Sequence, residues 1–244
     1  MAPAEAPAAP ASEAEQELGS LVVIGCCDCA CGGSRATAAM RAPTGCTWRE
    51  GTVTLGDTYT TLSVSARHLE HSSTRSEPPR ATLLSLRSGP DESERELACD
   101  VALSLARLCS SSNRSVVVAC CLRLTALRKP GCADLSPNPC KQSWPGTDHL
   151  DPIDHNSPVL DGFVSQLVHA LQFAGARALL VAMPSYRSDD PHSCHALAAT
   201  DTLGEALAPL LPAGCLYSAD DARQIDNVVL PHKLPQPSSE LMYA

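Results

Sequence analysis

The chain has 244 residues, of which 44% are hydrophobic and 3% aromatic, and its formal net charge is −9. This length allows one large α/β domain or two small ones, with a core built mainly from aliphatic and small side chains. An acidic chain lacks the clustered positive charge that binding to phosphate backbones requires, so we expect no nucleic-acid partner.

The N-terminal residues 1–18 are rich in Ala, Pro and Glu and have no hydrophobic periodicity, which predicts a disordered tail. This tail contains no Lys or Arg, unlike a secretory or transit peptide, and the apolar run 21–24 is far too short to span a bilayer. The 13 cysteines are odd in number and spread over a long chain, which is not typical of a secreted disulfide framework. We therefore expect a cytoplasmic protein, with the nucleus as a second compartment, and no membrane insertion.

The first half of the chain has mostly β patterns. A buried strand is followed by a Cys- and Gly-rich turn and an unpatterned stretch up to Trp48, in which Gly32 and Gly33 do not begin a good helix. Two β-branched runs separated by Gly56 and Asp57 have the composition of a hairpin. The predicted elements are a strand at 20–26, a hairpin at 52–56 and 59–66, a polar loop at 68–80 and a strand at 81–89.

The second half alternates helices with strands. Apolar residues recur every three or four positions over 91–109, with acidic residues in the first turn, which predicts an amphipathic helix. Ser157 and Pro158 are typical of a helix start, and an apolar stripe continues from there to Gly175. The predicted elements are a helix at 91–109, a strand at 115–127, a Pro- and Cys-rich loop insertion at 129–156, a helix at 157–175, a strand at 177–185 and a helix at 200–211.

This alternation predicts an α/β fold: a single domain with a mostly parallel central sheet flanked by helices, and flexible tails at both ends. We place the domain at 19–230, with the loop insertion inside it. The last segment, 231–244, contains several prolines and is expected to be an extended C-terminal tail.

Four cysteines lie close together in the stretch GCCDCACGG, namely Cys26, Cys27, Cys29 and Cys31. The C-x-x-C spacing of Cys26 and Cys29 lets two thiolates reach one zinc ion, but a structural zinc site needs four ligands. The sequence has no second C-x-x-C pair, and the cluster at 192–195, with two His and one Cys, has a spacing that no common site uses. We expect buried structural thiols without a metal, with a zinc or thiol-redox protein as an alternative.

The sequence contains none of the usual motifs for phosphate binding or for a serine nucleophile. His149 and His155 lie in the Pro-rich loop, where we expect them to be solvated, because catalytic geometry needs rigid support. We expect neither an enzyme nor a cofactor. An α/β hydrolase-like enzyme is the alternative, since a fold does not determine a function.

The C-terminal sequence SSELMYA ends with an apolar residue, a tyrosine and a small residue: Met242, Tyr243 and Ala244. A carboxylate on an extended segment can be captured by a lysine or by backbone amides, while the preceding side chains fill a groove. Tyrosine is a favourable anchor because it offers a large contact area and has few rotatable bonds. These residues predict a peptide-like anchor for a partner protein.

An α/β body without a catalytic motif that ends in a hydrophobic residue, a tyrosine and any residue resembles the proteasome assembly chaperones. The order of elements from Thr82 onward is also similar to that family, whereas the family's helix after the first strand has no clear counterpart at 25–50. The resemblance implies a non-enzymatic chaperone of 20S proteasome assembly that pairs with a sister, proteasome assembly chaperone 2. The pair would bind the proteasome α-ring subunits, promote α-ring formation and prevent off-pathway ring association. Met242, Tyr243 and Ala244 would dock between neighbouring α subunits, with the carboxylate of Ala244 on an inter-subunit lysine.

Overall fold

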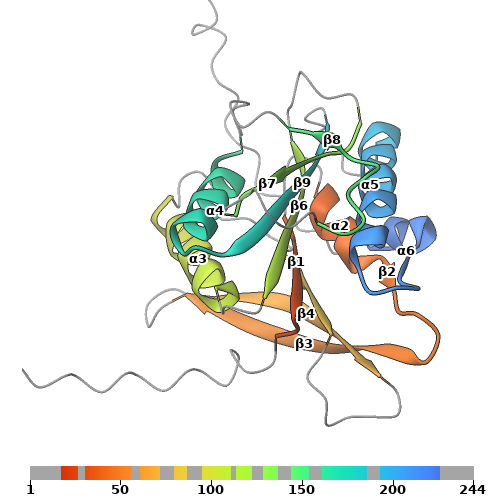
Figure 1. The fold of residues 1–244 in the computed structure, drawn as a ribbon, viewed down its shortest axis with the longest axis horizontal. Coiled ribbons are helices and arrows are strands. Elements are labelled where there is room, and N and C mark those ends of the chain that lie inside the picture. Colours follow the sequence, from red (N-terminus) through yellow and green to blue (C-terminus); the bar gives the residue numbers. More distant parts are fainter. Residues whose placement is uncertain are drawn as a thin grey trace, which may run out of the picture.

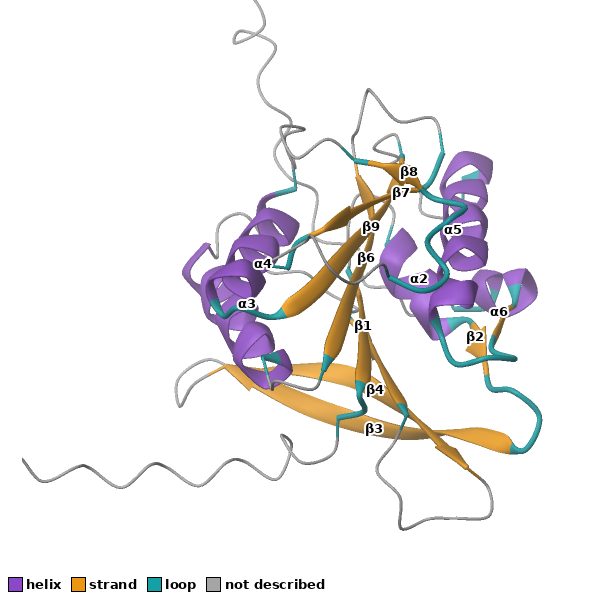
Figure 2. Cartoon of the chain, in the orientation of Figure 1, coloured by secondary structure: helices purple, strands orange, loops and turns teal. Residues whose placement is uncertain are grey.

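The computed structural model describes residues 18–26, 31–56, 61–71, 80–86, 95–110, 114–122, 129–136, 144–153, 161–185 and 193–225. These residues form one α/β domain, in which helices cover both faces of an eight-stranded sheet (Figure 1). Figure 2 separates the two kinds of element, with helices on either side of the strands. The expected fold class, a mostly parallel sheet flanked by helices, is confirmed. Leu18, assigned to the N-terminal tail, is buried in the core of the domain, and the rest of the two expected tails lies outside the described residues.

The strands are β1 (Leu21–Gly25), β2 (Met40–Arg41), β3 (Cys46–Gly56), β4 (Thr61–His71), β5 (Ala81–Ser85), β6 (Ser115–Leu122), β7 (Gly131–Asp134), β8 (Asp151–Pro152), β9 (Arg177–Pro184) and β10 (Leu216–Tyr217). The helices are α2 (Gly32–Ala38), α3 (Arg95–Cys109), α4 (Gly162–Phe173), α5 (Cys194–Leu207) and α6 (Ala219–Arg223), and a short 3-10 helix spans Ala208–Leu210.

The sheet has the strand order β3-β4-β5-β1-β6-β9-β7-β8. Its centre, β5-β1-β6-β9, is parallel throughout, whereas β3 and β4 form an antiparallel hairpin at one edge and β7 runs antiparallel to β9 near the other. After β1 the chain passes to the edge strand β3, returns through β4 to β5 beside β1, and then crosses to β6 on the other side of β1. This reversal is the pattern of doubly wound sheets.

Alternating side chains of the central strands supply two separate cores. Val22 and Ile24 of β1 lie in the core under α3 and α4, whereas Val23 points to the core under α2 and α5. The β6 strand repeats this pattern, and its residues from Val116 to Leu122 are at most 1% exposed. A parallel strand covered on both faces needs such a continuous apolar run, which is why this strand was predictable from the sequence.

Helix α2 was not predicted, and the expectation that Gly32 and Gly33 would not begin a helix is wrong. A Cβ on Gly33 would collide with the carbonyl oxygen of Ala119 in β6, and a Cβ on Gly32 would collide with Sγ of Cys121. The two glycines therefore let the helix backbone lie directly against the strand. The first βα unit is present, although its helix has only 7 residues.

Residues 129–156, expected to be a loop insertion, contribute two strands to the sheet. β7 pairs with β9 over four residues, and β8 pairs with β7 over two. These strands are short and their partners are distant in sequence, so no local sequence pattern predicts them.

Three predicted boundaries were also wrong. Helix α4 begins at Gly162 with Asp161 as its N-cap, not at Ser157, because the Asp161 side chain accepts a hydrogen bond from the Val164 amide at 2.8 Å. Helix α5 begins at Cys194 rather than at Thr200. Strand β4 continues into the predicted polar loop as far as His71. No helix among the described residues is long and apolar enough to cross a bilayer.

Candidate functional site

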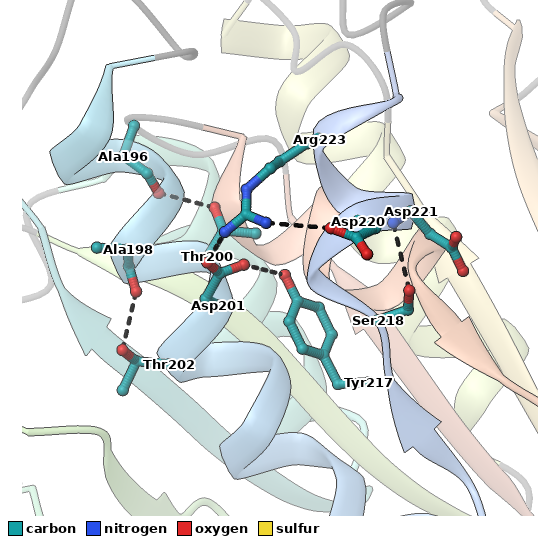
Figure 3. Close-up of polar contacts among 10 residues, drawn as sticks. All are labelled: Ala196, Ala198, Thr200, Asp201, Thr202, Tyr217, Ser218, Asp220, Asp221 and Arg223. Carbon is teal, nitrogen blue, oxygen red and sulfur yellow. Dashed lines mark hydrogen bonds and ion pairs between the residues drawn. The ribbon is translucent and has the colours of Figure 1, made fainter.

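The predicted anchor residues Met242, Tyr243 and Ala244 lie outside the described residues, of which 225 is the last. The structure does describe the part of the domain that precedes this segment. We use the name C-terminal base for the residues of α5, β10 and α6 that contact one another: Asp201, Gly204, Tyr217, Ser218, Asp220, Asp221 and Arg223. Figure 3 shows the hydrogen bonds and ion pairs among the polar side chains of this set.

Tyr217 joins β10 to α5. Its hydroxyl donates a hydrogen bond to Oδ1 of Asp201 at 2.8 Å (Figure 3). Its ring lies so close to Gly204 that a Cβ there would overlap the ring. Asp201 and Gly204 are three positions apart and therefore share one face of the helix. Burial raises the pKa of Tyr217, and the neighbouring Asp201 carboxylate raises it further because it disfavours a second negative charge.

Helix α6 is held at its start. The Ser218 side chain caps it by accepting a hydrogen bond from the Asp221 amide at 3.3 Å (Figure 3). Arg41 of β2 donates from Nε to Oδ2 of Asp221 at 2.7 Å and from Nη2 to Oδ1 at 2.8 Å, a bidentate pair. The hydrogen bond from Arg41 lowers the pKa of Asp221, and that of Arg41 is raised in turn. Both side chains are well exposed, so this pair orients the helix more than it stabilises the fold.

Arg223 connects the end of α6 back to α5. Its guanidinium lies 3.0 Å from the carboxylate of Asp201 and 3.3 Å from that of Asp220 (Figure 3). Asp201 thus accepts from both Tyr217 and Arg223. The carboxylates of the C-terminal base are bonded within the domain, and the arrangement fixes the position at which the chain continues beyond residue 225.

The cysteine cluster lies where β1 ends and α2 begins. Cys26 and Cys31 are buried, and the Cys26 amide donates to the carbonyl of Ala119 at 2.9 Å, which places the cluster beside β6. Cys27 and Cys29, the other two members, lie outside the described residues. Within the described ranges, no group of three or more Cys, His, Asp or Glu residues is placed to hold a metal ion.

Several other thiols are held in their protonated form. Burial raises the pKa of Cys109 to about 12 and that of Cys215 to about 11, and it also raises the pKa of Cys132. The thiolate is the reactive form of cysteine, so burial makes these three side chains less reactive than an exposed thiol.

Two of the four histidines that the sequence singled out, His149 and His195, lie in the described part of the chain. His149 is exposed, as predicted, although its Nε2 lies 3.1 Å from the carbonyl oxygen of Ala206 in α5. Cys194 and His195 occupy the first turn of α5 and are exposed. His155 and His192 lie outside the described residues.

Ligands of doubly wound sheets bind at the carboxyl ends of the strands, where the strand order reverses. Here this point lies between β1 and β6, and the glycine contacts of α2 bring helix backbone directly against both strands. The residues that follow the four parallel strands, 27–30, 87–94, 123–128 and 186–192, lie outside the described residues.

The C-terminal base was missed by the sequence analysis for two reasons. Ser218 and Asp221 have the S-x-x-D spacing of a helix start, a signal that was available and not used. In contrast, the bonds of Asp201 to Tyr217 and Arg223 join separate elements, and no local pattern predicts them.

The parallel centre, the hairpin at one edge and the helices on both faces define a doubly wound α/β domain. No protein-family model matches the chain, and no curated protein matches it in sequence. Among the solved structures that share its fold are two from Pyrococcus furiosus.

One is the crystal structure of Pyrococcus furiosus PbaB, described as an archaeal proteasome activator, with 9% identity and a TM-score of 0.52 over 85% of this chain and 88% of that one. The other is the monoclinic form of P. furiosus PbaA, described as an archaeal homolog of proteasome-assembly chaperone, with 11% identity and a TM-score of 0.53 over 85% of this chain and 83% of that one. At these identities the likeness is one of fold.

Proposed function

We propose that this protein is a non-enzymatic chaperone of 20S proteasome assembly. The observation that carries the proposal is the shared fold with PbaB and PbaA over 85% of the chain. The ending Met242, Tyr243 and Ala244 supports it independently, because it has the hydrophobic, Tyr, any-residue pattern of proteasome-binding tails.

The finer part of the proposal concerns the partners. The protein acts in the cytoplasm and nucleus in the manner of proteasome assembly chaperone 1, which the order of its elements resembles from Thr82 onward. It pairs with proteasome assembly chaperone 2, and the pair binds α-ring subunits, promotes ring formation and prevents off-pathway ring association. The segment beyond residue 225 starts from the fixed position of α6 and delivers Tyr243 into a groove between two α subunits, with Met242 adding apolar contact.

The experiment compares full-length wild type with Tyr243→Ala for binding to purified α-ring assembly intermediates. A buried tyrosine anchor contributes about 2 kcal/mol, so we expect affinity to fall about 30-fold. One added residue after Ala244 should also weaken binding, because it moves the carboxylate away from its cation.

Ser239→Ala is the matched control, since it lies in the same segment outside the motif, and it should bind like wild type. Formation of the complex with the sister chaperone serves as the control for folding. Unchanged ring binding by both Tyr243→Ala and the extended chain would refute the docking role. Absence of ring binding by wild type would refute the function itself.

A further inference from the structure

Strand β3 forms a long edge of the sheet. It spans 11 residues, about twice the usual strand length, and it pairs with β4 residue by residue without a bulge. Among the described residues β4 is its only partner in the sheet. The outer side of β3 therefore presents a row of backbone donors and acceptors along its length.

This edge carries none of the usual features that prevent pairing with another strand. Residues 46–56 include no Pro and no Lys. Its two charged side chains each have an ion-pair partner on β4: Nε of Arg49 lies 2.6 Å from the carboxylate of Glu70, and the carboxylate of Glu50 lies 3.1 Å from Nε of Arg67. Three threonines, a valine and a tryptophan also give the strand high β propensity.

The opposite edge of the same sheet is protected. Strand β8 consists only of Asp151 and Pro152, both exposed. A two-residue strand with an acidic side chain and a proline gives an incoming strand almost nothing to bind. The two edges of the sheet therefore differ in how well they are protected against pairing with another strand.

We propose that β3 pairs with β3 of a second copy of this chain, antiparallel and centred on Gly51, to form one sheet across a dimer, a contact separate from the proposed complex with the sister chaperone. Gly51 is the midpoint of Cys46–Gly56, so this register uses the strand's full length. A two-fold axis perpendicular to the sheet passes between the two glycines, where two backbones can approach without side chains.

Charge disfavours the registers centred one and two residues before Gly51. A centre at Arg49 would place two arginines opposite each other, and a centre at Glu50 would place two glutamates opposite each other, which destabilises a strand pair. A centre at Gly51 instead places Arg49 opposite Val53 of the second copy and Glu50 opposite its Thr52.

In this register the half of β3 that α3 covers also lies beside the half of the second strand that no described helix covers. Val53 and Leu55 are buried in the core under α3, whereas Thr47 and Arg49, on the same face, are exposed. Pairing about Gly51 sets the exposed half of each strand beside the helix-covered half of the other.

The test uses the full chain and two opposite charges at Thr52, an exposed position that faces Glu50 of the second copy. Thr52→Glu places two carboxylate pairs across the dimer, and each weakens association by up to about fivefold, so we expect the dimer Kd to rise about 10- to 30-fold. Thr52→Lys places an ammonium opposite the same carboxylates and should leave the Kd unchanged or lower it. Analytical ultracentrifugation over a concentration series measures both values.

Hydrogen exchange on wild type provides a second readout that needs no substitution. Amides of β3 should become more protected as the protein concentration rises, while those of β8 should not. A wild-type chain that stays monomeric over the whole series would overturn the proposal. So would a dimer that tolerates Thr52→Glu, or one that both Thr52 variants weaken equally. Thermal unfolding of the dilute variants checks that each is folded.

Discussion

Gly204 shows how a single residue determines the shape of the C-terminal base. The Tyr217 ring occupies the space that any side chain at position 204 would need, and Asp201, on the same helix face, binds the hydroxyl of that ring. A glycine inside a helix costs about 0.5–1 kcal/mol relative to alanine. Its presence in α5 is explained by this contact.

We predict that Gly204→Ala destabilises the domain by about 1–3 kcal/mol, because the added methyl group must displace the Tyr217 ring. Gly162→Ala is the matched control: position 162 also lies in a helix, and a Cβ there meets nothing within 4 Å. That variant should be neutral or slightly stabilising. Urea unfolding of the two variants measures the difference; equal free energies of unfolding would contradict the packing of the Tyr217 ring against α5.

Gly32 and Gly33 mark the limit of what single residues reveal in a sequence. Glycine disfavours a helix locally, and this property led to the wrong prediction for 25–50. The fold requires glycine at both positions because a Cβ there would collide with Ala119 or Cys121 of β6, two residues that lie far away in sequence. The same residue type therefore indicates a turn by local rules and a close helix–strand contact in the fold.

At the scale of elements, the start of α4 separates the sequence-based prediction from the structure. Ser157 and Pro158 resemble a helix start, yet the described helix is capped by Asp161. Asp161→Ala should destabilise the domain by about 1 kcal/mol, the usual contribution of an N-cap. Ser157→Ala should change the free energy of unfolding little. Thermal unfolding decides between them, and the reverse order of effects would mean that the helix begins at Ser157.

Elements with a long apolar pattern were predictable, and short ones were not. The β1 and β6 strands, the β3–β4 hairpin and the α3 helix follow patterns set by burial on one or two faces. In contrast, β2 and β10 have two residues each and, in the described part of the chain, pair only with one another, through Met40 with Tyr217 and Arg41 with Leu216. Such pairs arise from the tertiary fold and leave no periodic signal. The predicted anchor at 242–244 lies outside the described residues and stays a prediction.

At the scale of the whole molecule, buried acids couple stability to pH. Cys109, in the core under α3 and α4, has its pKa raised to about 12 by burial, against about 9 for an ordinary thiol. In the unfolded chain this thiol loses its proton near pH 9, while in the folded domain it keeps it. Deprotonation therefore favours the unfolded state, so the stability is complete below about pH 9 and is lost as the pH rises toward about 12.

The last prediction follows from this coupling. Above about pH 9, Cys109 alone should lower the free energy of unfolding by about 1.4 kcal/mol per pH unit, and Cys215 and Tyr217 steepen the loss because their pKa values are also raised. Urea unfolding in reducing buffer between about pH 8 and about pH 11 measures the slope. Cys109→Ala should make the slope shallower, while Cys99→Ala, which removes an exposed thiol from the same helix, should leave it unchanged. Parallel slopes for wild type and Cys109→Ala would mean that the Cys109 thiol is not held protonated by the core.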